Sequence, residues 1–363
     1  MNQPPVGPDP ARALCPICLD YFPWREDPLY ERVVEASGAR WEPVNLSGIN
    51  NAVKRADRRA RCYVKCTNPS RDGTPEHYLP VSHRGHGEPV VIGLVGRGKS
   101  GKTHLLVAML LEALRGDLSA HGLSFEPADE FRHLLFKQSI DQFLRGKKLD
   151  STKDRVHDFA AYFLVRTPDG RARPLIFFDV AGEDFMTPGL GGRNARFLLG
   201  ATALMFVDDP EHTVPARRPD AIDGPAAQND AFNTAVARLR SRGDIRKVPV
   251  AVVITKADEL RYEHPVDRWF RRDDASEPLS AAGFRAESRD VFALLHHHGA
   301  QPVLEVFEQF DRGTLHVVSA TGTPVDQGVY PRGVRPVRVL RPLLALLAMT
   351  GVVEGPEASE VGR

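Results

Sequence analysis

Eight consecutive residues have the types and spacing needed to bind phosphate. The segment GRGKSGKT fits the pattern G-x-x-x-x-G-K-[ST], and it lies between an apolar run typical of a strand and a run with helical spacing. Its glycines let backbone N–H groups turn towards an anion at the start of a helix, where the dipole also favours negative charge. Lys102 would bring a charge to the outer phosphates, and the hydroxyl of Thr103 suits Mg²⁺. We expect the whole loop to bind a nucleotide: Gly96, Arg97, Gly98, Lys99, Ser100, Gly101, Lys102 and Thr103.

Three further polar segments follow apolar runs. Asp179 comes directly after the run PLIFF, and the chain continues as DVAGED. At the carboxyl end of a strand, its carboxylate could hold the water shell of the same Mg²⁺. The segment TKAD, residues 255–258, comes after VAVVI, and SAT, residues 319–321, comes after LHVV.

In this order, the four segments resemble the motif set of the Ras-like, translation-factor-related P-loop GTPases, the TRAFAC class. The resemblance implies that the loop from Thr255 binds nucleotide, with Lys256 along the guanine base. It implies that Asp258 accepts two hydrogen bonds from the N1 and N2 edge of guanine, and that the backbone of Ser319 and Ala320 meets the guanine oxygen. Adenine would leave such a buried carboxylate unpaired, so we expect GTP to be preferred over ATP.

The resemblance also implies a hydrolytic apparatus. Water would attack the γ-phosphate in line, with charge neutralised by Lys102, Mg²⁺ and loop amides that include the one of Gly182. This class places a threonine before its second strand to sense the γ-phosphate through Mg²⁺; Thr152 is the best match, with Ser151 as its rival. Glu183 stands where many relatives place a glutamine that orients the water. Because an ionised glutamate only accepts hydrogen bonds and adds negative charge beside the phosphate, we expect slow intrinsic turnover.

The four cysteines form two close pairs, Cys15-x-x-Cys18 and Cys62-x-x-x-Cys66. They resemble the two knuckles of a zinc ribbon, and tetrahedral Zn²⁺ needs four soft ligands. We expect a structural zinc site made by all four thiolates, with reduced buried thiols as the alternative. Three nearby histidines could substitute, although we expect linker residues there: His77, His83 and His86. The arginine-rich run ADRRAR before Cys62 leaves nucleic acid open as a partner of this module without favouring it.

Composition divides the chain of 363 residues into three zones. Residues 1–86 hold the cysteines and end in a stretch rich in Gly, Pro and His, which indicates a zinc-ribbon-like module and a linker. Residues 87–352 alternate strand-like and helix-like runs, which is typical of a mainly parallel sheet with helices on both faces. Residues 353–363 indicate a disordered tail.

The predicted fold is therefore α/β, a Ras-like P-loop NTPase with a mostly parallel six-stranded sheet. The turn sequence TPDG between two of the strands predicts an antiparallel hairpin. Two segments, 117–150 and 262–312, are longer than the minimal fold requires. We expect these insertions to be lids or partner surfaces, since long insertions in compact domains are usually functional or disordered.

Charge and hydropathy exclude other function classes. Forty-eight Lys and Arg against forty-seven Asp and Glu leave a net charge of +1, so no global field attracts nucleic acid or acidic lipid. No apolar run reaches the roughly 18 residues that span a bilayer, and the amino terminus lacks the apolar core of a signal peptide. We expect a cytoplasmic protein that has no membrane partner.

We interpret the chain as a GTP- and GDP-binding protein that hydrolyses GTP with Mg²⁺, a slow regulatory switch with an unidentified protein effector or activator. The DVAGED segment, the cysteine module and the RVLRPLLALL run further resemble the double-GTPase proteins of bacterial conflict and signalling systems. Two alternatives stay open. One is a nucleotide-gated scaffold for protein interactions that does not hydrolyse GTP, and the other is an ATPase.

Overall fold

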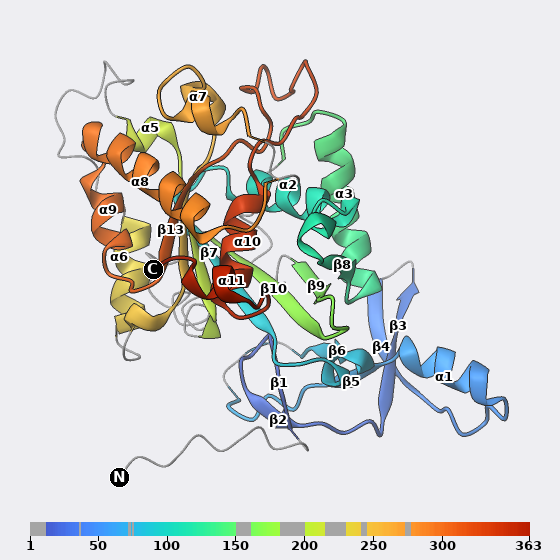
Figure 1. Cartoon of the computed structure of the whole chain (residues 1–363). Helices are drawn as coiled ribbons and strands as arrows, with labels where there is room; N and C mark the ends of the chain where they lie inside the picture. Colours follow the sequence, from blue (N-terminus) through green and yellow to red (C-terminus); the bar gives the residue numbers. More distant parts are fainter. Residues whose placement is uncertain are drawn as a thin grey trace, which may run out of the picture.

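A seven-stranded, mostly parallel sheet lies at the centre of the protein (Figure 1). The computed structural model describes residues 12–35, 38–71, 74, 76–149, 161–181, 200–214, 230–240, 245–272 and 277–363. The strand order is β13-β12-β11-β7-β10-β9-β8. In chain order, the strands are β7 (Val90–Gly96), β8 (Ser124–Pro127), β9 (Ala161–Arg166), β10 (Ala172–Ala181), β11 (Ala203–Asp208), β12 (Val250–Ile254) and β13 (Gly313–Val317).

The pairing of the strands agrees with the predicted mainly parallel sheet. β10, β7, β11, β12 and β13 pair in parallel, and every residue of β7 is buried because helices cover both faces. β9 and β10 form the antiparallel hairpin that the TPDG turn predicts. The seventh strand, β8, was not predicted. It has only four residues, one of them proline, and it pairs antiparallel with β9 at the edge of the sheet.

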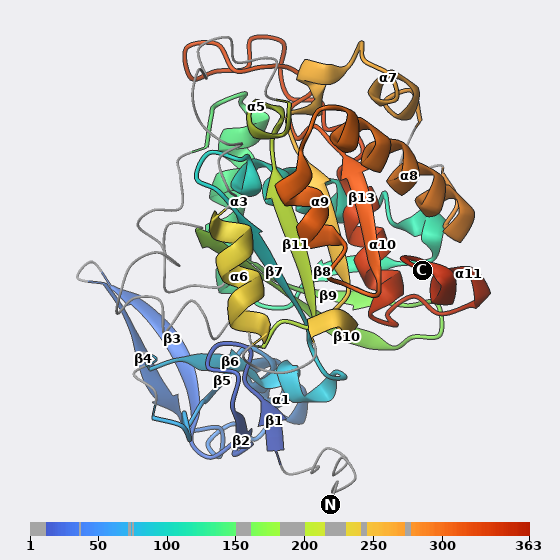
Figure 2. The same cartoon turned by 90° about the vertical axis from the view of Figure 1, so that its left-hand side faces the viewer.

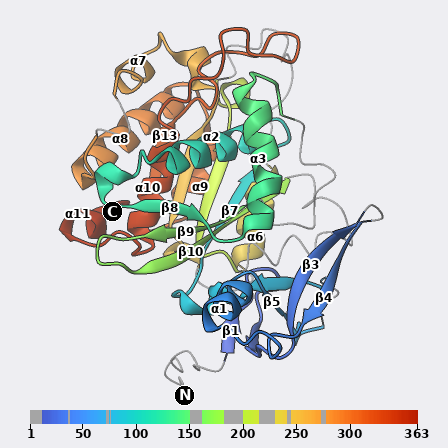
Figure 3. The same cartoon turned by 90° about the vertical axis from the view of Figure 1, so that its right-hand side faces the viewer.

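Helices cover the sheet in two layers, which Figures 2 and 3 show from opposite sides. One layer contains α2 (Lys102–Arg115), α3 (Glu130–Leu144) and α10 (Leu340–Met349). The other contains α6 (Asp230–Arg240) and α9 (Gln301–Phe307), while α8 (Ala281–His297) packs against β13. The remaining helical segments are short: η1 (Val81–Gly85), η2 (Ser119–His121), α5 (Pro210–Thr213), η6 (Ile245–Lys247), η7 (Ala257–Leu260), α7 (Val266–Trp269) and α11 (Pro356–Glu360).

The outer segments contribute to the packed core. In the segments 117–150 and 262–312, Phe143 of α3 and Val291 of α8 are fully buried, and the role of these segments as lids or partner surfaces stays a prediction. The last residues form α11 and not a disordered tail, and Val361 is fully buried. Burial of these apolar side chains stabilises the packing of their segments against the sheet.

The amino-terminal part forms a separate group of small strands. β1 (Arg12–Leu14) and β2 (Tyr21–Pro23) make a hairpin. A four-stranded sheet in the order β4-β3-β5-β6 joins β3 (Leu29–Glu35), β4 (Gly38–Val44), β5 (Tyr63–Lys65) and β6 (Tyr78–Pro80). The helix α1 (Ala52–Ala60) has no buried residue. We call this part, residues 12–86, the amino-terminal module.

The module packs at the amino-terminal end of β7, away from the edge where β7 leads into α2 (Figures 1 and 2). Its buried side chains Phe22 and Leu79 belong to the same apolar cluster as Val91 and Val95 of β7. The module and the central sheet therefore share one hydrophobic core.

His83 links the module to the sheet through two hydrogen bonds. Its Nε2 donates to the carbonyl of Leu14 at 2.9 Å, and its Nδ1 accepts from the hydroxyl of Tyr162 on β9 at 2.6 Å. This assignment requires the neutral ring. Burial lowers the pKa of His83 to about 4 from an ordinary value near 6.5.

We expect this buried histidine to make the folded protein acid-sensitive. Because the folded pKa lies below the unfolded one, the unfolded chain binds more protons between about pH 6.5 and 4, and stability falls as pH falls through that window. Between pH 7 and pH 5, the unfolding free energy of the parent should fall by roughly 2 kcal/mol more than that of His83→Gln does. Urea unfolding at both pH values measures this.

The exposed His297 supplies the control for this experiment. His297→Gln should lose as much unfolding free energy between the two pH values as the parent does. An equal acid sensitivity in His83→Gln and the parent would contradict the assignment.

Candidate functional site

Two glycines of the predicted phosphate loop are required by backbone geometry. A Cβ on Gly96 would lie 2.2 Å from the carbonyl oxygen of Val207, because β7 and β11 converge there. Gly101 is the N-cap of α2 and has φ +86°, a left-handed conformation that favours glycine. Since no side chain caps α2, the first N–H groups of this helix stay available to an anion.

Two polar side chains of the loop, Ser100 and Lys102, are buried inside its turn. Lys102 is 6% exposed, and its Nζ donates to the carbonyl oxygens of Gly96 and Arg97 at 2.8 and 2.7 Å. The fully buried Ser100 donates its hydroxyl to the same Arg97 carbonyl at 3.0 Å. The ammonium group is therefore held inside the turn, whereas the side chain of Lys99 is exposed.

The strand register places Asp179, one of the predicted magnesium residues, near the edge of the sheet where the phosphate loop begins. In the parallel pairing of β10 with β7, Ala181 stands opposite Gly96 and Asp179 stands opposite Leu94. Thr103 lies in the first turn of α2. A hydroxyl and a carboxylate are donors that Mg²⁺ prefers, so this donor set fits that ion.

Thr255 joins the phosphate loop to the next loop of the sheet edge. Its hydroxyl donates to the carbonyl of Ser100 at 2.5 Å and to that of Asp208 at 3.1 Å, and its N–H donates to Asp208 at 2.8 Å. Ser100 and Thr255 are 155 residues apart in the chain. The structure thus brings the phosphate loop and the TKAD segment into direct contact.

The TKAD segment contacts the loop after β13 in turn. Asp258 is 7% exposed, and its Oδ1 accepts from the hydroxyl of Ser319 at 2.5 Å. The N–H of Ala257 donates to the carbonyl of Val318 at 3.0 Å, and Ser319 exchanges two backbone hydrogen bonds with Val337. The predicted base-binding residues Asp258, Ser319 and Ala320 therefore lie together, all of them buried.

Sequence reasoning did not include a charged cluster at the end of β11. Asp208 and Asp209 are each 1% exposed. Nδ1 of His212 lies 2.7 Å from Oδ1 of Asp209, and Nζ of Lys256 lies 2.5 Å from its Oδ2. Two acidic residues directly after the apolar run ALMFV were the available signal.

The two neighbouring carboxyl groups titrate in opposite directions. Burial raises the pKa of Asp208 to about 6, and the nearby charges of His212 and Arg97 offset only part of this. Burial also acts on Asp209, but hydrogen bonds from His212 and Lys256 outweigh it and hold its pKa below the usual value. Asp209 therefore keeps its charge to a lower pH than Asp208 does.

Several predicted site residues lie outside the described part of the chain. These are Ser151, Thr152, Gly182 and Glu183. The γ-phosphate-sensing hydroxyl, the loop amide and the water-side glutamate stay predictions.

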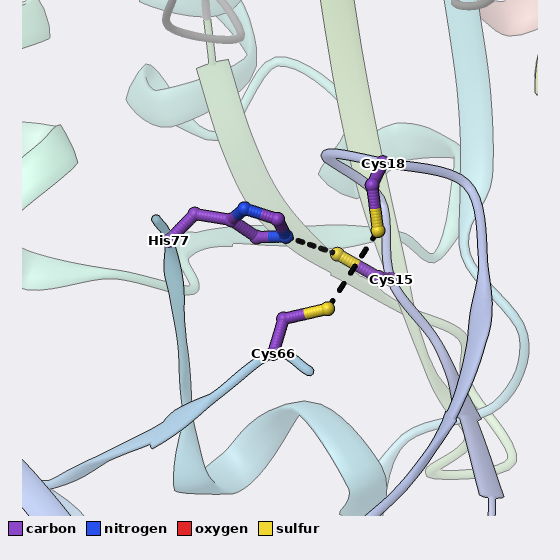
Figure 4. Close-up of side chains that lie close together, drawn as sticks. All are labelled: Cys15, Cys18, Cys66 and His77. Carbon is purple, nitrogen blue, oxygen red and sulfur yellow. Dashed lines mark hydrogen bonds between the residues drawn. The ribbon is translucent and has the colours of Figure 1, made fainter. Parts of the chain in front are cut away.

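Three of the four cysteines gather in the amino-terminal module, together with a histidine (Figure 4). Sγ of Cys15 lies 3.2 Å from Nε2 of His77, and Sγ of Cys18 lies 3.6 Å from Sγ of Cys66. All four side chains are buried. Hydrogen bonds from Cys15 and Cys18 lower the pKa of Cys66 to about 4, whereas burial raises the pKa of Cys15. The cluster is compatible with a metal site.

The structure does not bring Cys62 into this cluster, contrary to the predicted set of four thiolates. Its Sγ lies 3.2 Å from the carbonyl oxygen of Arg58. Cys62 and Cys66 flank the extended strand β5, and four residues of a strand span about 13 Å, which is too far for two ligands of one ion. His77 takes the place because its carbonyl accepts the N–H of Cys66 on the neighbouring chain segment.

The sheet order, the phosphate loop and the guanine-side loops define a Ras-like P-loop GTPase of the TRAFAC class. A model of the Double-GTPase 2 family matches residues 90–306, which is more than half of the chain. The protein belongs to the Double-GTPase 2 family. Ser319 and Ala320 lie beyond the matched residues, so only the structure connects them to the site.

Solved GTPase structures are similar at low identity. The bacterial selenocysteine-specific elongation factor EF-Sec is 14% identical with a TM-score of 0.27, over 64% of this chain and 26% of that chain. Sup35 complexed with GDP is 15% identical with a TM-score of 0.28, over 69% and 43%. The GTP-bound GTPase-like domain of Ski7 from S. cerevisiae is 12% identical with a TM-score of 0.33, over 75% and 52%. The chain spans from about a quarter to about half of the length of these three structures.

No curated protein matches the chain. Among the described residues, no helix has both the length and the apolar character needed to cross a bilayer.

We expect the Thr255 hydroxyl to stabilise the joined loops. Thr255→Val keeps the shape of the side chain and removes the hydroxyl donor from the buried carbonyl of Ser100, while the carbonyl of Asp208 keeps the N–H of Thr255. An unsatisfied buried acceptor costs about 1–3 kcal/mol, and urea unfolding should show a loss of unfolding free energy in that range.

Thr350→Val is the matched control. Its hydroxyl bonds carbonyls at the end of α10, and one of these, Leu346, also accepts the N–H of Thr350. The control should lose clearly less unfolding free energy. Equal losses in the two variants would show that the bridge between the loops contributes nothing of its own.

Proposed function

We propose that the protein binds GTP and GDP at the edge formed by β7, β11, β12 and β13, and that it hydrolyses GTP to GDP and phosphate with Mg²⁺. The observation that carries this is the contact of Thr255 with Ser100, which joins the phosphate loop to the segment that contains Asp258. One nucleotide can then have its phosphates at the start of α2 and its base at the buried Asp258. Family membership supports GTP as the ligand.

The residues divide the work by their chemistry. Lys102 and the N–H groups at the start of α2 hold the outer phosphates. Thr103 and Asp179 would hold Mg²⁺, and the ion would supply positive charge against the phosphates. Asp258, fixed by Ser319, accepts the N1 and N2 protons of guanine and leaves adenine without a matching donor pair.

The rate of hydrolysis is the finer part of the proposal. Glu183 in place of a water-orienting glutamine favours slow turnover, and Thr152 is proposed to complete the magnesium shell. We infer a regulatory switch with a protein effector or activator in a bacterial signalling or conflict system, from the resemblance of the sequence motifs. Multiple-turnover phosphate release separates this enzyme from a non-hydrolysing scaffold, which would release no phosphate above background.

We expect calorimetry to show binding of GDP and GTP, with ATP unable to displace either. Asp258→Asn should weaken GDP binding by on the order of a hundredfold, because the amide keeps one neutral acceptor oxygen and turns a donor NH2 group towards the second N–H of guanine. Glu259→Gln, at an exposed position of the same short helix, is the control and should bind GDP as the parent does. Equal affinities of the parent for ATP and GTP would reject guanine recognition.

The second part of the proposal concerns the cysteine–histidine cluster, to which we assign structural Zn²⁺. Tetrahedral coordination with Zn–S near 2.3 Å and Zn–N near 2.0 Å separates ligand atoms by about 3.5–3.8 Å. The observed separations of 3.2 and 3.6 Å are close to this. Backbone N–H groups of Ile17 and Asn68 also lie 3.4 Å from the sulfurs of Cys15 and Cys66, as in loops that support bound thiolates.

We expect Cys66→Ser to lose the bound zinc and Cys62→Ser to keep it. The two residues are alike in type and burial and are four positions apart, so the comparison isolates membership of the cluster. Metal analysis of the purified proteins measures the zinc content. Loss of zinc in both variants would support a site made by all four cysteines and contradict the cluster with His77. A parent protein that contains no metal would contradict the proposed zinc site.

A further inference from the structure

The carboxylate of Asp209 has no assigned task in nucleotide binding, although it is buried beside the base-side loop. Asp209 is the N-cap of α5, a position where a carboxylate usually accepts the first N–H groups of the helix. No such side-chain cap is formed. Its two oxygens accept hydrogen bonds from His212 at 2.7 Å and from Lys256 at 2.5 Å. The side chain is therefore committed to partners other than its own helix.

Lys256 lies two residues before Asp258, in the loop where we propose that the base binds. Its backbone is left-handed, with φ 50°, and its side chain is 36% exposed, whereas the carboxylate of Asp209 is 1% exposed. A lysine stem has four rotatable bonds and loses about 2 kcal/mol of rotamer entropy when it is fixed. An ion pair with an immobile buried carboxylate fixes the ammonium end before any ligand arrives, so a base can pack along a stem that is already ordered.

A cation site is the competing interpretation of this cluster. The ligand atoms of Asp208, Asp209 and His212 lie within 4.8 Å of one another. However, the ammonium group of Lys256 already lies against Asp209 and would repel a divalent ion at that oxygen. Lys256 supplies a positive charge and His212 supplies a hydrogen bond, so this buried carboxylate has partners without a metal.

We propose that Asp209 is a positioning residue for guanine-nucleotide binding, which holds Lys256 along the base while His212 holds Asp209 from the other side. This inference rests on the proposed function, since it requires a nucleotide at the TKAD loop. The base is common to GDP and GTP. The contribution of Asp209 is therefore the same for both ligands and independent of the γ-phosphate.

A double-mutant cycle tests the inference, with GDP and GTP affinities measured by calorimetry on the full chain. Asp209→Asn and Lys256→Met should each weaken GDP binding by on the order of tenfold, and GTP binding by the same factor. Adding Asp209→Asn to Lys256→Met should change the GDP affinity by less than about twofold, because the residue acts only through the lysine.

The control variant is Asp311→Asn. Asp311 lies just before the first residue of β13, at the end of the sheet opposite to the proposed nucleotide site. The substitution breaks an exposed ion pair with Arg246 and should leave both affinities unchanged. Asp209→Ser replaces Asp209→Asn in the cycle if the latter does not fold, since serine is also a good N-cap for α5.

Two results would overturn the inference while leaving the proposed function intact. The first is a folded Asp209 variant that binds GDP within about twofold of the parent. The second is an Asp209 substitution that weakens binding as strongly in the Lys256→Met background as in the parent, which would mean that Asp209 acts by another route. Failure of the parent to bind GDP at all would instead reject the proposed function itself.

Discussion

The hydroxyl of Thr255 is the interaction on which the arrangement of the site depends. β7, β11 and β12 are neighbours in the sheet, so their carboxyl ends meet at one edge, but strand pairing alone does not set the distances between the loops that follow. Thr255 donates to a carbonyl of the phosphate loop and to one at the end of β11. Because these acceptors are buried, losing the donor is costly, and the two loops are kept in a single relative position.

The rest of the edge extends from this contact. Ala257 bonds to Val318, and Asp258 bonds to Ser319, so the loop after β13 is fixed to the loop after β12. Ser319 is held in turn by Val337, which follows the long excursion of the chain beyond β13. A site built in this way is largely formed before a ligand binds, which reduces the ordering cost of association.

The sequence predicted the features that depend on residues close together in the chain. It did not predict the features that depend on pairing with another segment of the chain. The phosphate loop, the buried strand β7 and the helix α2 all have strong local signals, and the structure has them. The spacing of Cys62 and Cys66 indicated a knuckle, but the residues between them pair with β3 and β6 and stay extended. The pairing of β5 with β6 places His77 beside Cys66, and the spacing of two cysteines does not indicate which strand pairs with the segment between them.

The same limit applies to the acidic pair at the end of β11. The two adjacent aspartates are visible in the sequence. Only the fold decides which of them keeps its charge to the lower pH. Asp209 receives a hydrogen bond from Lys256, 47 residues further along the chain, and its pKa is lowered, whereas Asp208 is dominated by burial and its pKa rises to about 6. Two carboxylates in sequence thus acquire different chemistry from partners that no spacing rule connects.

The position of the cysteine–histidine cluster decides what kind of effect a metal there can have. The cluster lies in the module at the amino-terminal end of β7, and the phosphate loop begins at the other end of that strand. Leu14, next to Cys15, is joined through His83 to Tyr162 of β9, and β9 pairs with β10, the strand that contains Asp179. A metal bound by these residues would be too far from the phosphate loop to contact a nucleotide there. It would instead stabilise the hydrophobic core that the module shares with the central sheet.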